Sequence, residues 1–519
     1  MKGTNFLTRM KKSCMVLALA AGMVLGATAG AQAIDFKAKG EWRIAFGLGN
    51  ANLRGGAGTP KDDLFGATQR LRLQLDAVAS ENLSGRVWFE IGYTDWGRNG
   101  NGGASGGALG ADGVNVKVKN AYLDWIVPET DLKIRMGLQN LTLPNAAGGS
   151  AIFGAADVAA ITGSYQFTDE VGLTAFWLRP VNDNFNGSAR RNFNDRHYLD
   201  NFDLFGVTVP LTFDGFEVTP WAMYGMLGRN TIADGLNTSD GNLTTSLYAN
   251  VGNQGRFNRF SHSNAYCSTF WAGLPIKVTA LDPVNIEFDV NYGYVGGFGK
   301  DDVWNFKRGN WKRADSRREG WLIKALVEYK MDWGVPGIFG WYASGDDGDV
   351  KNGSERMPSI KANQKFSSFL CAAGQDFYPG TFKGRFNEQK DSLAGTWGVG
   401  LQVRDMEFLE DLKHTFRVMY YGGTNDVSMV KYFSTPNSWD TGDLYEGPYL
   451  TKNDGLVEFN LDNTYKIYEN LQVGFDLGYV INCMDNGTWK HSRRWGDGLK
   501  QNMSKHDAWK AQLTFNYTF

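Results

Sequence analysis

The stretch Asp35-Phe-Lys-Ala-Lys-Gly-Glu-Trp-Arg-Ile-Ala-Phe46 carries small or apolar side chains in alternation with charged ones. Even-numbered positions carry Phe, Ala, Gly, Trp, Ile and Phe, whereas the odd-numbered positions up to Arg43 carry Asp, Lys, Lys, Glu and Arg. A period of two residues is that of a β-strand, whose successive side chains point to opposite faces. One face suits hydrocarbon and the other suits water, which is the pattern of a strand in a transmembrane barrel wall.

The same alternation recurs along the chain in segments of about ten residues. Clear examples lie at 70–77, 284–294, 321–329 and 471–481. Short and long connections alternate between the segments, and the short turns fall at 80–82, 128–130, 167–170, 214–215, 281–283, 332–334, 405–411 and 468–470. This spacing predicts a closed antiparallel all-β barrel of about 18 strands, with 16 as the alternative, because closure needs an even number. A break of phase between Val118 and Ala121 predicts a β-bulge there.

A large soluble antiparallel protein, such as a sandwich or a propeller, would also show alternation. Such a protein buries its apolar faces in one core, whereas here nearly every segment has comparable apolar and polar faces. Aromatic residues lie toward the predicted strand ends, where the interfacial girdles of a barrel are expected: Trp42, Tyr93, Trp125, Tyr294, Trp333 and Tyr342. The pattern therefore favours the membrane barrel.

The N-terminus has the features of a cleaved secretory signal. Four basic residues precede an apolar run from Met15 to Ala29, and Ala31-Gln32-Ala33 fits an A-x-A cleavage site. The alternative, a lone anchoring helix, is disfavoured because the run is short and interrupted by glycines. We expect residues 1–33 to be the signal and residues 34–519 to form one barrel domain.

Charge and cysteine content exclude several other classes. Removing four positive charges and no acids shifts the formal net charge from −2 to −6, so nothing favours nucleic-acid binding. No later apolar run is long enough for a membrane-spanning helix. Three cysteines remain after cleavage, without a C-x-x-C pair: Cys267, Cys371 and Cys483. One disulfide with a free thiol and no disulfide at all are therefore equally open.

The C-terminal segment Trp509-Lys-Ala-Gln-Leu-Thr-Phe-Asn-Tyr-Thr-Phe519 resembles the last strand of Gram-negative outer-membrane porins. In those proteins the barrel-assembly machinery reads the final aromatic residue, and here the matching positions are Leu513, Phe515, Tyr517 and Phe519. Ile134-Arg-Met-Gly-Leu-Gln-Asn140, followed by a Gly/Ala-rich loop, resembles the strand before the inward-folded third loop of trimeric general porins. Together with the N-terminal stretch and the length, the chain is similar to the homotrimeric porins of anaerobic sulfate-reducing bacteria.

This resemblance implies a homotrimer of water-filled pores in the outer membrane, in contact with lipid and lipopolysaccharide. Each pore would let small hydrophilic solutes diffuse through a constriction formed by the loop from Asn140 to Ala159. The loop departs from the general-porin pattern because Asp157 is its only carboxylate. A strong field between an acidic loop and a basic wall is therefore not expected.

Basic residues predominate on the inner faces predicted for the first five strands. The constriction candidates are Arg70, Arg72, Arg86, Lys133 and Arg135, together with Asp157 from the loop. Fixed charges in a narrow water-filled passage select ions, so we hypothesise a mild anion preference. The alternative is that these residues pair with acids of the wall and merely keep it hydrated.

No catalytic, metal or cofactor motif is found in the sequence. There is no H-E-x-x-H, no G-x-S-x-G and no phosphate-binding glycine loop, so we expect no cofactor and no enzymatic activity. The acidic tract Asp346-Asp-Gly-Asp349 offers oxygen ligands for calcium but lacks the EF-hand spacing, and we interpret it as a solvated turn. The alternatives to a general porin are a substrate-specific channel and a lipase-like barrel enzyme.

Overall fold

The computed structural model describes residues 34–50, 53–55, 64–97, 116–182, 201–228, 237–238, 241–242, 247, 266–297, 299–368, 392–433, 449–489 and 504–519. No helix in these segments is long and apolar enough to cross a membrane. The described helices are α4 (Asn486–Trp489) and the 3-10 helix η6 (Val427–Tyr432).

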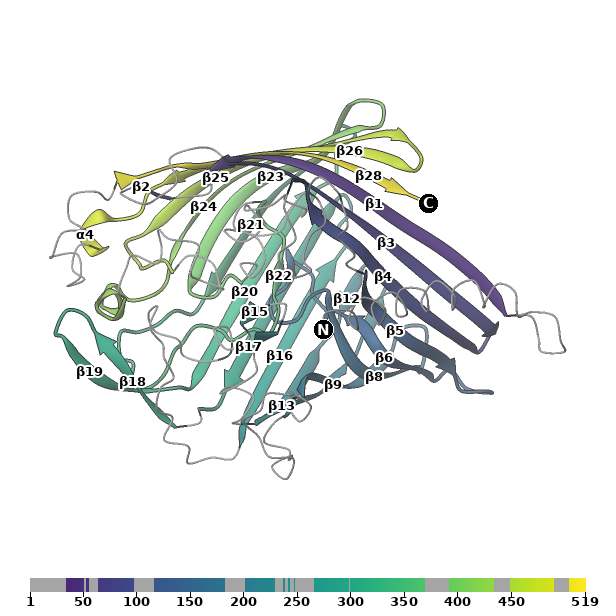
Figure 1. Ribbon diagram of the computed structural model, residues 1–519, viewed down its shortest axis with the longest axis horizontal. Coiled ribbons are helices and arrows are strands. Elements are labelled where there is room, and N and C mark those ends of the chain that lie inside the picture. The colour runs from purple at the N-terminus through teal and green to yellow at the C-terminus, as the bar shows by residue number, and fades with distance from the viewer. Residues whose placement is uncertain are drawn as a thin grey trace, which may run out of the picture.

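The predicted closed antiparallel barrel of 18 strands is confirmed (Figure 1). The first half of the wall consists of β1 (Asp35–Asn50), β3 (Leu64–Ser80), β4 (Leu83–Asp95), β5 (Val116–Ile126), β6 (Lys133–Leu141), β8 (Ala156–Gln166), β9 (Gly172–Asn182), β10 (Asn201–Thr208) and β13 (Trp221–Gly228). The second half consists of β16 (Tyr266–Val278), β17 (Val284–Val295), β20 (Arg318–Tyr329), β21 (Val335–Ala343), β23 (Thr396–Leu409), β24 (Leu412–Gly423), β25 (Gly455–Tyr468), β26 (Leu471–Asn482) and β28 (Ala508–Thr518).

Two wall strands are interrupted where proline removes a backbone N–H donor. Pro210 separates β10 from β11 (Leu211–Phe213), and Pro220 separates β12 (Phe216–Val218) from β13. The short pieces β11 and β12 pair with each other and complete this hairpin at the short-turn end of the barrel.

The predicted short turns separate the wall strands, with one correction. We expected a turn over 405–411, but β23 continues to Leu409 and only residues 410–411 form the turn. The strand pairing shifts register between Val403 and Met406, and Asp405 adopts a φ of 55°. Asp405 therefore marks a bulge, whose polar residue looks like a turn in the sequence.

The bulge predicted between Val118 and Ala121 is confirmed. Trp88 of β4 pairs with Asn120 of β5, while the next residue, Phe89, pairs with Val118. Lys119 is therefore the extra residue, and it changes the phase of alternation within β5.

Exposed aromatic side chains form a belt near each end of the outer surface. At the short-turn end the belt includes Trp125, Tyr165, Tyr329, Trp333, Phe408 and Tyr468. At the long-loop end it includes Phe205, Tyr224, Phe270, Trp321, Tyr342 and Trp397. Between them the outward positions are mainly aliphatic, such as Val399 and Leu401 of β23. Two such belts with an apolar band between them are typical of a barrel that crosses a membrane.

The barrel closes where the first strand meets the last. The pairing of β1 with β28 runs from Glu41–Thr518 to Asn50–Trp509, and Figure 1 shows the two strands side by side. Beyond this ladder, the Gly40 N–H donates to the Phe519 carbonyl at 2.7 Å, and the Phe519 N–H donates back at 3.1 Å. A Cβ at Gly40 would lie 2.3 Å from the Phe519 ring, so a larger residue there would displace this aromatic side chain.

We predict that Gly40→Val weakens the closing seam because it displaces the Phe519 ring. The expected cost is about 1–3 kcal/mol, as for overpacking elsewhere. The measurement is the temperature at which the folded barrel loses its compact mobility on an SDS gel. Gly163→Val in β8 is the matched control, because nothing lies within 4 Å of its added Cβ. Equal transition temperatures for both variants would contradict the proposed packing of the Phe519 ring over Gly40.

Candidate functional site

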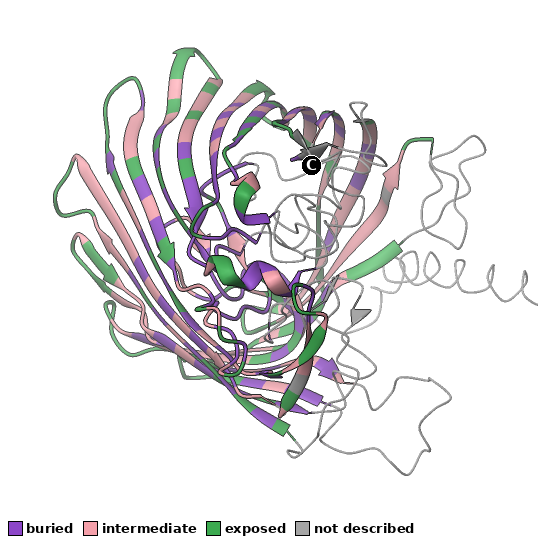
Figure 2. Ribbon diagram, turned by 90° about the vertical axis from the view of Figure 1, so that its left-hand side faces the viewer, coloured by how far each residue is buried: buried purple, intermediate pink, exposed green. Residues whose placement is uncertain are grey.

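Two segments between wall strands fold into the barrel: the third loop (residues 142–155) and the inner strap (residues 344–368). Figure 2 shows coil segments inside the ring of strands. Within the lumen, β7 (Gly149–Ser150) of the third loop pairs with β22 (Asn363–Gln364) of the inner strap. The Ile152 carbonyl accepts hydrogen bonds from the N–H groups of Ile360 and Lys361 at 3.0 and 2.9 Å. The two segments therefore form one unit.

A buried ion pair attaches this unit to the opposite part of the wall. Lys324 of β20 and Asp289 of β17 are 0% and 1% exposed, and their charged atoms lie 3.4 Å apart. Lys324 also donates to the Gly149 carbonyl and to Gln364 Oε1. Asp289 accepts from the Ala146 N–H at 3.0 Å. Because β9, β10, β13 and β16 separate β8 from β17, the third loop crosses the lumen to reach this pair.

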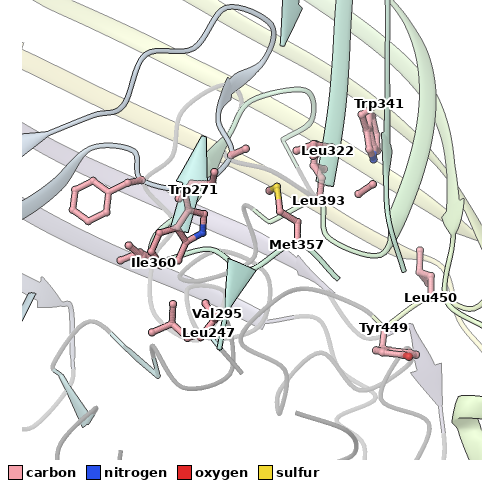
Figure 3. Close-up of a cluster of buried hydrophobic side chains, with 14 of the residues drawn as sticks. Leu247, Trp271, Val295, Leu322, Trp341, Met357, Ile360, Leu393, Tyr449 and Leu450 are labelled. Atoms are coloured by element: carbon pink, nitrogen blue, oxygen red, sulfur yellow. The ribbon is translucent and has the colours of Figure 1, made fainter. Parts of the chain in front are cut away.

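The inward face of the wall near this unit is apolar, which the alternation did not predict. Phe366 of the strap stacks on Phe339 and Trp341, with ring centroids 4.9 and 5.5 Å away. The indole N–H of Trp271 donates to the Pro358 carbonyl at 3.0 Å. Figure 3 shows Trp271 and Trp341 in a cluster of buried hydrophobic side chains that also includes Met357 and Ile360 of the strap. The inward residues are apolar here because the loops cover them and exclude water.

Trp221 belongs to this covered region. Its side chain is 5% exposed, and its indole N–H donates to the Pro144 carbonyl of the third loop at 3.1 Å. Its side chain is directed inward, where its ring packs against the loop.

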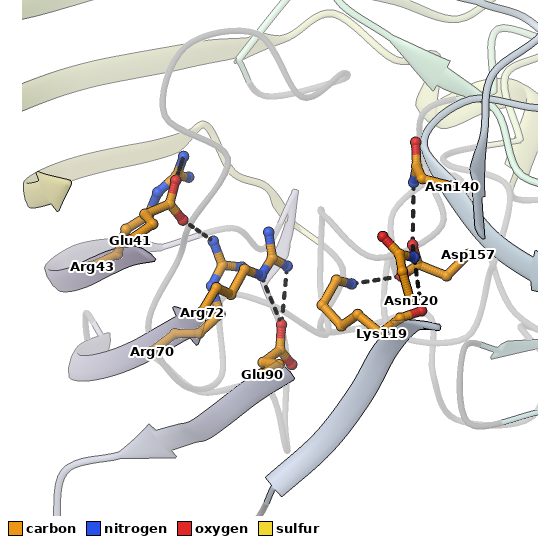
Figure 4. A network of polar contacts seen from close by, with 9 residues as sticks. All are labelled: Glu41, Arg43, Arg70, Arg72, Glu90, Lys119, Asn120, Asn140 and Asp157. Carbon is orange, nitrogen blue, oxygen red and sulfur yellow. Dashed lines mark hydrogen bonds and ion pairs between the residues drawn. The ribbon is translucent and has the colours of Figure 1, made fainter. Parts of the chain in front are cut away.

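The wall formed by β1, β3 and β4 carries alternating charges instead (Figure 4). Glu41 lies between two arginines, at 3.0 Å from Arg43 and 3.2 Å from Arg70. Arg72 binds Glu90 through Nε and Nη2, each at 3.0 Å. These five side chains come from adjacent strands because the β1–β3 and β3–β4 registers place them on neighbouring inward positions.

We expected Asp157 in a constriction loop from Asn140 to Ala159, but the loop spans only residues 142–155, and Asp157 belongs to strand β8. Its carboxylate lies close to this charged wall. It accepts hydrogen bonds from Lys119 Nζ at 2.7 Å, from Asn120 at 2.8 Å and from Asn140 at 3.3 Å. The bulge at Lys119 explains the contact, since it lets two consecutive residues of β5 approach the same carboxylate. Sequence phase alone would have placed Lys119 and Asn120 on opposite faces.

The remaining predicted constriction residues lie nearer the short-turn end. Arg86 pairs with Asp76 at 2.6 Å, and Arg135 pairs with Asp124 at 2.6 Å. Both guanidinium groups face the Tyr122 ring, at 5.8 and 4.2 Å from its centroid. Lys133 is the first residue of β6 and is exposed. The six predicted residues are therefore spread along the wall and do not form one ring.

Sequence reasoning missed the residues that hold the inner segments in place. Lys510 of β28 is 5% exposed and donates to the Ser368 carbonyl at the end of the strap. Like Asp289 and Lys324, it is a charged residue at an inward position of its strand. That signal was visible, but alternation cannot tell a residue facing water from one facing a folded loop.

The acidic tract Asp346–Asp349 is not wholly a solvated turn. Asp346 is 3% exposed and accepts hydrogen bonds from Ser354 Oγ at 2.5 Å and Tyr449 OH at 2.6 Å. Burial, with Asp346 and Asp347 close by, raises the pKa of Glu355 to about 7. The tract therefore helps to fix the start of the inner strap.

Some of the remaining residues singled out in the sequence lie in the described segments, and others do not. Leu513, Phe515, Tyr517 and Phe519 lie on β28 or directly after it, and the Tyr517 and Phe519 rings are 5.7 Å apart. Cys483 is exposed and is a free cysteine, whereas Cys267 is buried in β16. Ala31, Ala33, Cys371 and the side chain of Tyr93 lie outside the described residues.

The fold and the site define the class: a closed β-barrel with an apolar outer surface, a charged inner wall and two loops folded into the lumen. No known protein family and no curated protein matches this sequence. Solved structures that match include OccK8 (OprE) of Pseudomonas aeruginosa, with 9% identity over 93% of this chain and 98% of the other, at a TM-score of 0.49. Another is OccAB3 of Acinetobacter baumannii, with 12% identity over 93% and 99% of the two chains, at a TM-score of 0.48.

OccK2 (OpdF) of Pseudomonas aeruginosa, solved in complex with glucuronate, also matches, with 10% identity over 93% and 98% of the two chains and a TM-score of 0.49. These values are too low to transfer a function. The strand pairing of this chain itself establishes the barrel.

We predict that Lys324→Met releases the third loop and the inner strap from the wall. Removing one member of a buried pair leaves Asp289 without its counter-charge, which costs about 3–5 kcal/mol. The measurement is amide hydrogen exchange at Ile360, Lys361 and Gly154, whose N–H groups bond between the two segments.

Two further variants test the cause. Asp289→Asn combined with Lys324→Met removes both charges and should recover part of the protection. Lys330→Met is the matched control, because Lys330 and Asp282 are 57% and 78% exposed at a turn. Unchanged exchange in Lys324→Met would show that the pair does not hold the loops.

The raised pKa of Glu355 predicts a pH-dependent strap. A carboxyl whose pKa is raised on folding is favoured in its protonated form, so its contribution to stability is complete below about pH 4.5 and is lost as pH rises through about 7. We expect protection factors of the Asp347 and Ser354 amides to fall between pH 5 and pH 8. Glu355→Gln should remove this dependence, while Asp302→Asn in an exposed pair should retain it. A wild-type profile that is flat over this range would refute the prediction.

Proposed function

We propose that this protein is an outer-membrane channel through which small hydrophilic solutes diffuse passively. The observation that carries the proposal is the closed wall with an apolar outer belt and a charged inner face. The apolar outer belt is compatible with a lipid bilayer, whereas the charged inner face requires water. The long loops then face outside and the short turns face the periplasm, as in other bacterial barrels.

The route that we propose runs along the charged wall and beside the inner segments. The third loop and the strap pack against β16–β24, so the described apolar part of the lumen is filled. The wall around β1, β3 and β4 instead presents Glu41, Arg43, Arg70, Arg72 and Glu90. Charged side chains there have partners and stay compatible with water.

The charge of this wall supports a weak preference for anions. Three arginines face two glutamates in the network, and the nearby Lys119–Asp157 pair adds no net charge. One excess positive charge in a narrow passage raises the local concentration of anions. Because every arginine in the network is paired, the preference should be mild.

The decisive experiment is a planar-bilayer recording under a KCl gradient. We expect ion conductance with a reversal potential that indicates mild anion preference. Replacing Arg70 and Arg72 together with glutamine should lower the anion-to-cation permeability ratio by about twofold. Arg313→Gln, in an exposed ion pair of a long loop, should leave it unchanged.

Each result of the recording separates alternatives. Clear cation preference of the wild-type protein would remove the anion hypothesis but keep the channel. Absent conductance together with lipid hydrolysis would support the barrel enzyme instead. Liposome swelling with sugars and organic acids of graded size would distinguish a general porin from a substrate-specific channel.

Assembly and export complete the proposal. The resemblance to trimeric porins supports a homotrimer, and current steps in multiples of three would agree with it, whereas single steps would favour a monomer. Recognition of Phe519 by the barrel-assembly machinery is proposed from the terminal strand. Cleavage after Ala33 would give a mature protein that begins at Ile34, which its intact mass would reveal.

A further inference from the structure

A cavity of about 460 Å³ opens outside the lumen, at the long-loop end of the barrel. It lies where the outer faces of β17, β20 and β21 meet the start of the inner strap. Its size falls within the range of about 300–1,000 Å³ that small-molecule sites occupy. The channel proposed above does not use this cavity, because the aromatic residues that line it belong to the outer surface.

Three of the residues that line the cavity are aromatic. Trp321 and Tyr342 stack on each other with ring centroids 5.4 Å apart and an interplanar angle of 22°. They are 40% and 49% exposed, so a face of the stack remains available. Tyr292 is the third, and its hydroxyl donates to Glu319 Oε1 at 2.8 Å.

The lining also includes polar groups, which offer both donors and acceptors. Asn352 donates to Asp347 at 3.0 Å, and the Asp347 N–H donates to Glu355 at 3.1 Å. No ion pair within the described part of the chain includes Glu319, Asp347 or Glu355. These carboxylates thus keep free lone pairs at the cavity. Arg317 also lines it, whereas Lys452 faces Asp426 at 3.7 Å.

We propose that this cavity is a binding site for a sugar ring. The C–H face of a pyranose packs on an exposed aromatic ring, and its hydroxyl groups donate to carboxylates and accept from arginine and amide donors. A lining that combines exposed aromatic rings with mixed polar groups provides both kinds of contact.

The net charge of the cavity lining favours an uncharged sugar over an anionic ligand. Arg317 and Lys452 contribute two positive charges, while Glu319, Asp346, Asp347 and Glu355 contribute four carboxylates, so the lining has a formal charge of −2. A phosphate or carboxylate ligand would be repelled. An uncharged sugar is not repelled, and its hydroxyl groups satisfy the carboxylate lone pairs.

The position of the cavity suggests two sources for the sugar. Trp321 and Tyr342 belong to the aromatic belt at the long-loop end, where such belts meet lipid headgroups. The ring could therefore come from a glycolipid of the outer leaflet or from a free saccharide. The chemistry is the same for both, and the experiment distinguishes them.

The test uses the full-length mature chain in a sugar-free zwitterionic detergent. Saturation-transfer NMR with methyl β-D-glucopyranoside should show saturable binding. Trp321→Ala should weaken binding by about tenfold, and Trp321→Phe, which keeps an aromatic face, should stay within about threefold of the wild type. Trp397→Ala is the matched control, because Trp397 is an exposed aromatic of the same belt that does not line the cavity.

The readouts also separate this site from sugar binding in the lumen. All variants should keep the wild-type conductance and the compact gel mobility of a folded barrel. No saturable transfer to the wild-type protein would overturn the proposal, as would equal binding by Trp321→Ala. In lipid nanodiscs, loss of the signal on adding a glucosyl diacylglycerol would assign the site to membrane glycolipid, and an unchanged signal would assign it to free sugar.

Discussion

The structure depends on one constraint: every backbone N–H and C=O in the wall must find its partner within the wall. A bilayer offers no water to an unpaired group, so a sheet that spans it must close on itself. Here closure is achieved by the antiparallel ladder between β1 and β28 and by the contact of Phe519 with Gly40. The alternation of side chains, the belts of aromatic residues and the enclosed lumen all depend on this closed ladder.

Closure creates an interior, and the chain divides that interior unevenly. The third loop and the inner strap give the apolar residues of β16–β24 something to pack against, while β1, β3 and β4 keep their charges in mutual pairs. Side chains that face inward therefore have two different environments in the same barrel. The Lys324–Asp289 pair lies within the covered part, where it binds the loops through a pair of charges that the loops themselves shield from water.

The strands of the wall were predictable from the sequence because the pattern that identifies each strand lies within that strand. A period of two residues identifies each strand, and the final Phe519 and the short turns mark where strands end. Lys119 was even predictable as part of a bulge. Asp405 was not, since a polar residue with left-handed backbone has the same local signature in a bulge as in a turn. The arginines of the wall were identified, but their carboxylate partners come from neighbouring strands, so their pairing depends on register. The inner strap escaped prediction altogether, because contacts such as Phe366 on Trp341 join distant segments that share no repeating pattern.

The first strand extends beyond the ladder that closes the barrel. β28 pairs with β1 only from Glu41 onward, so residues 35–39 are paired with β3 on one side and present a bare backbone edge on the other. An unpaired edge is a template on which any extended segment can add itself. This short overhang carries Asp35, Lys37 and Lys39, whose charges oppose the addition of another strand. The charges of the first strand, which alternate with apolar residues along it, therefore also protect this unpaired edge of the sheet.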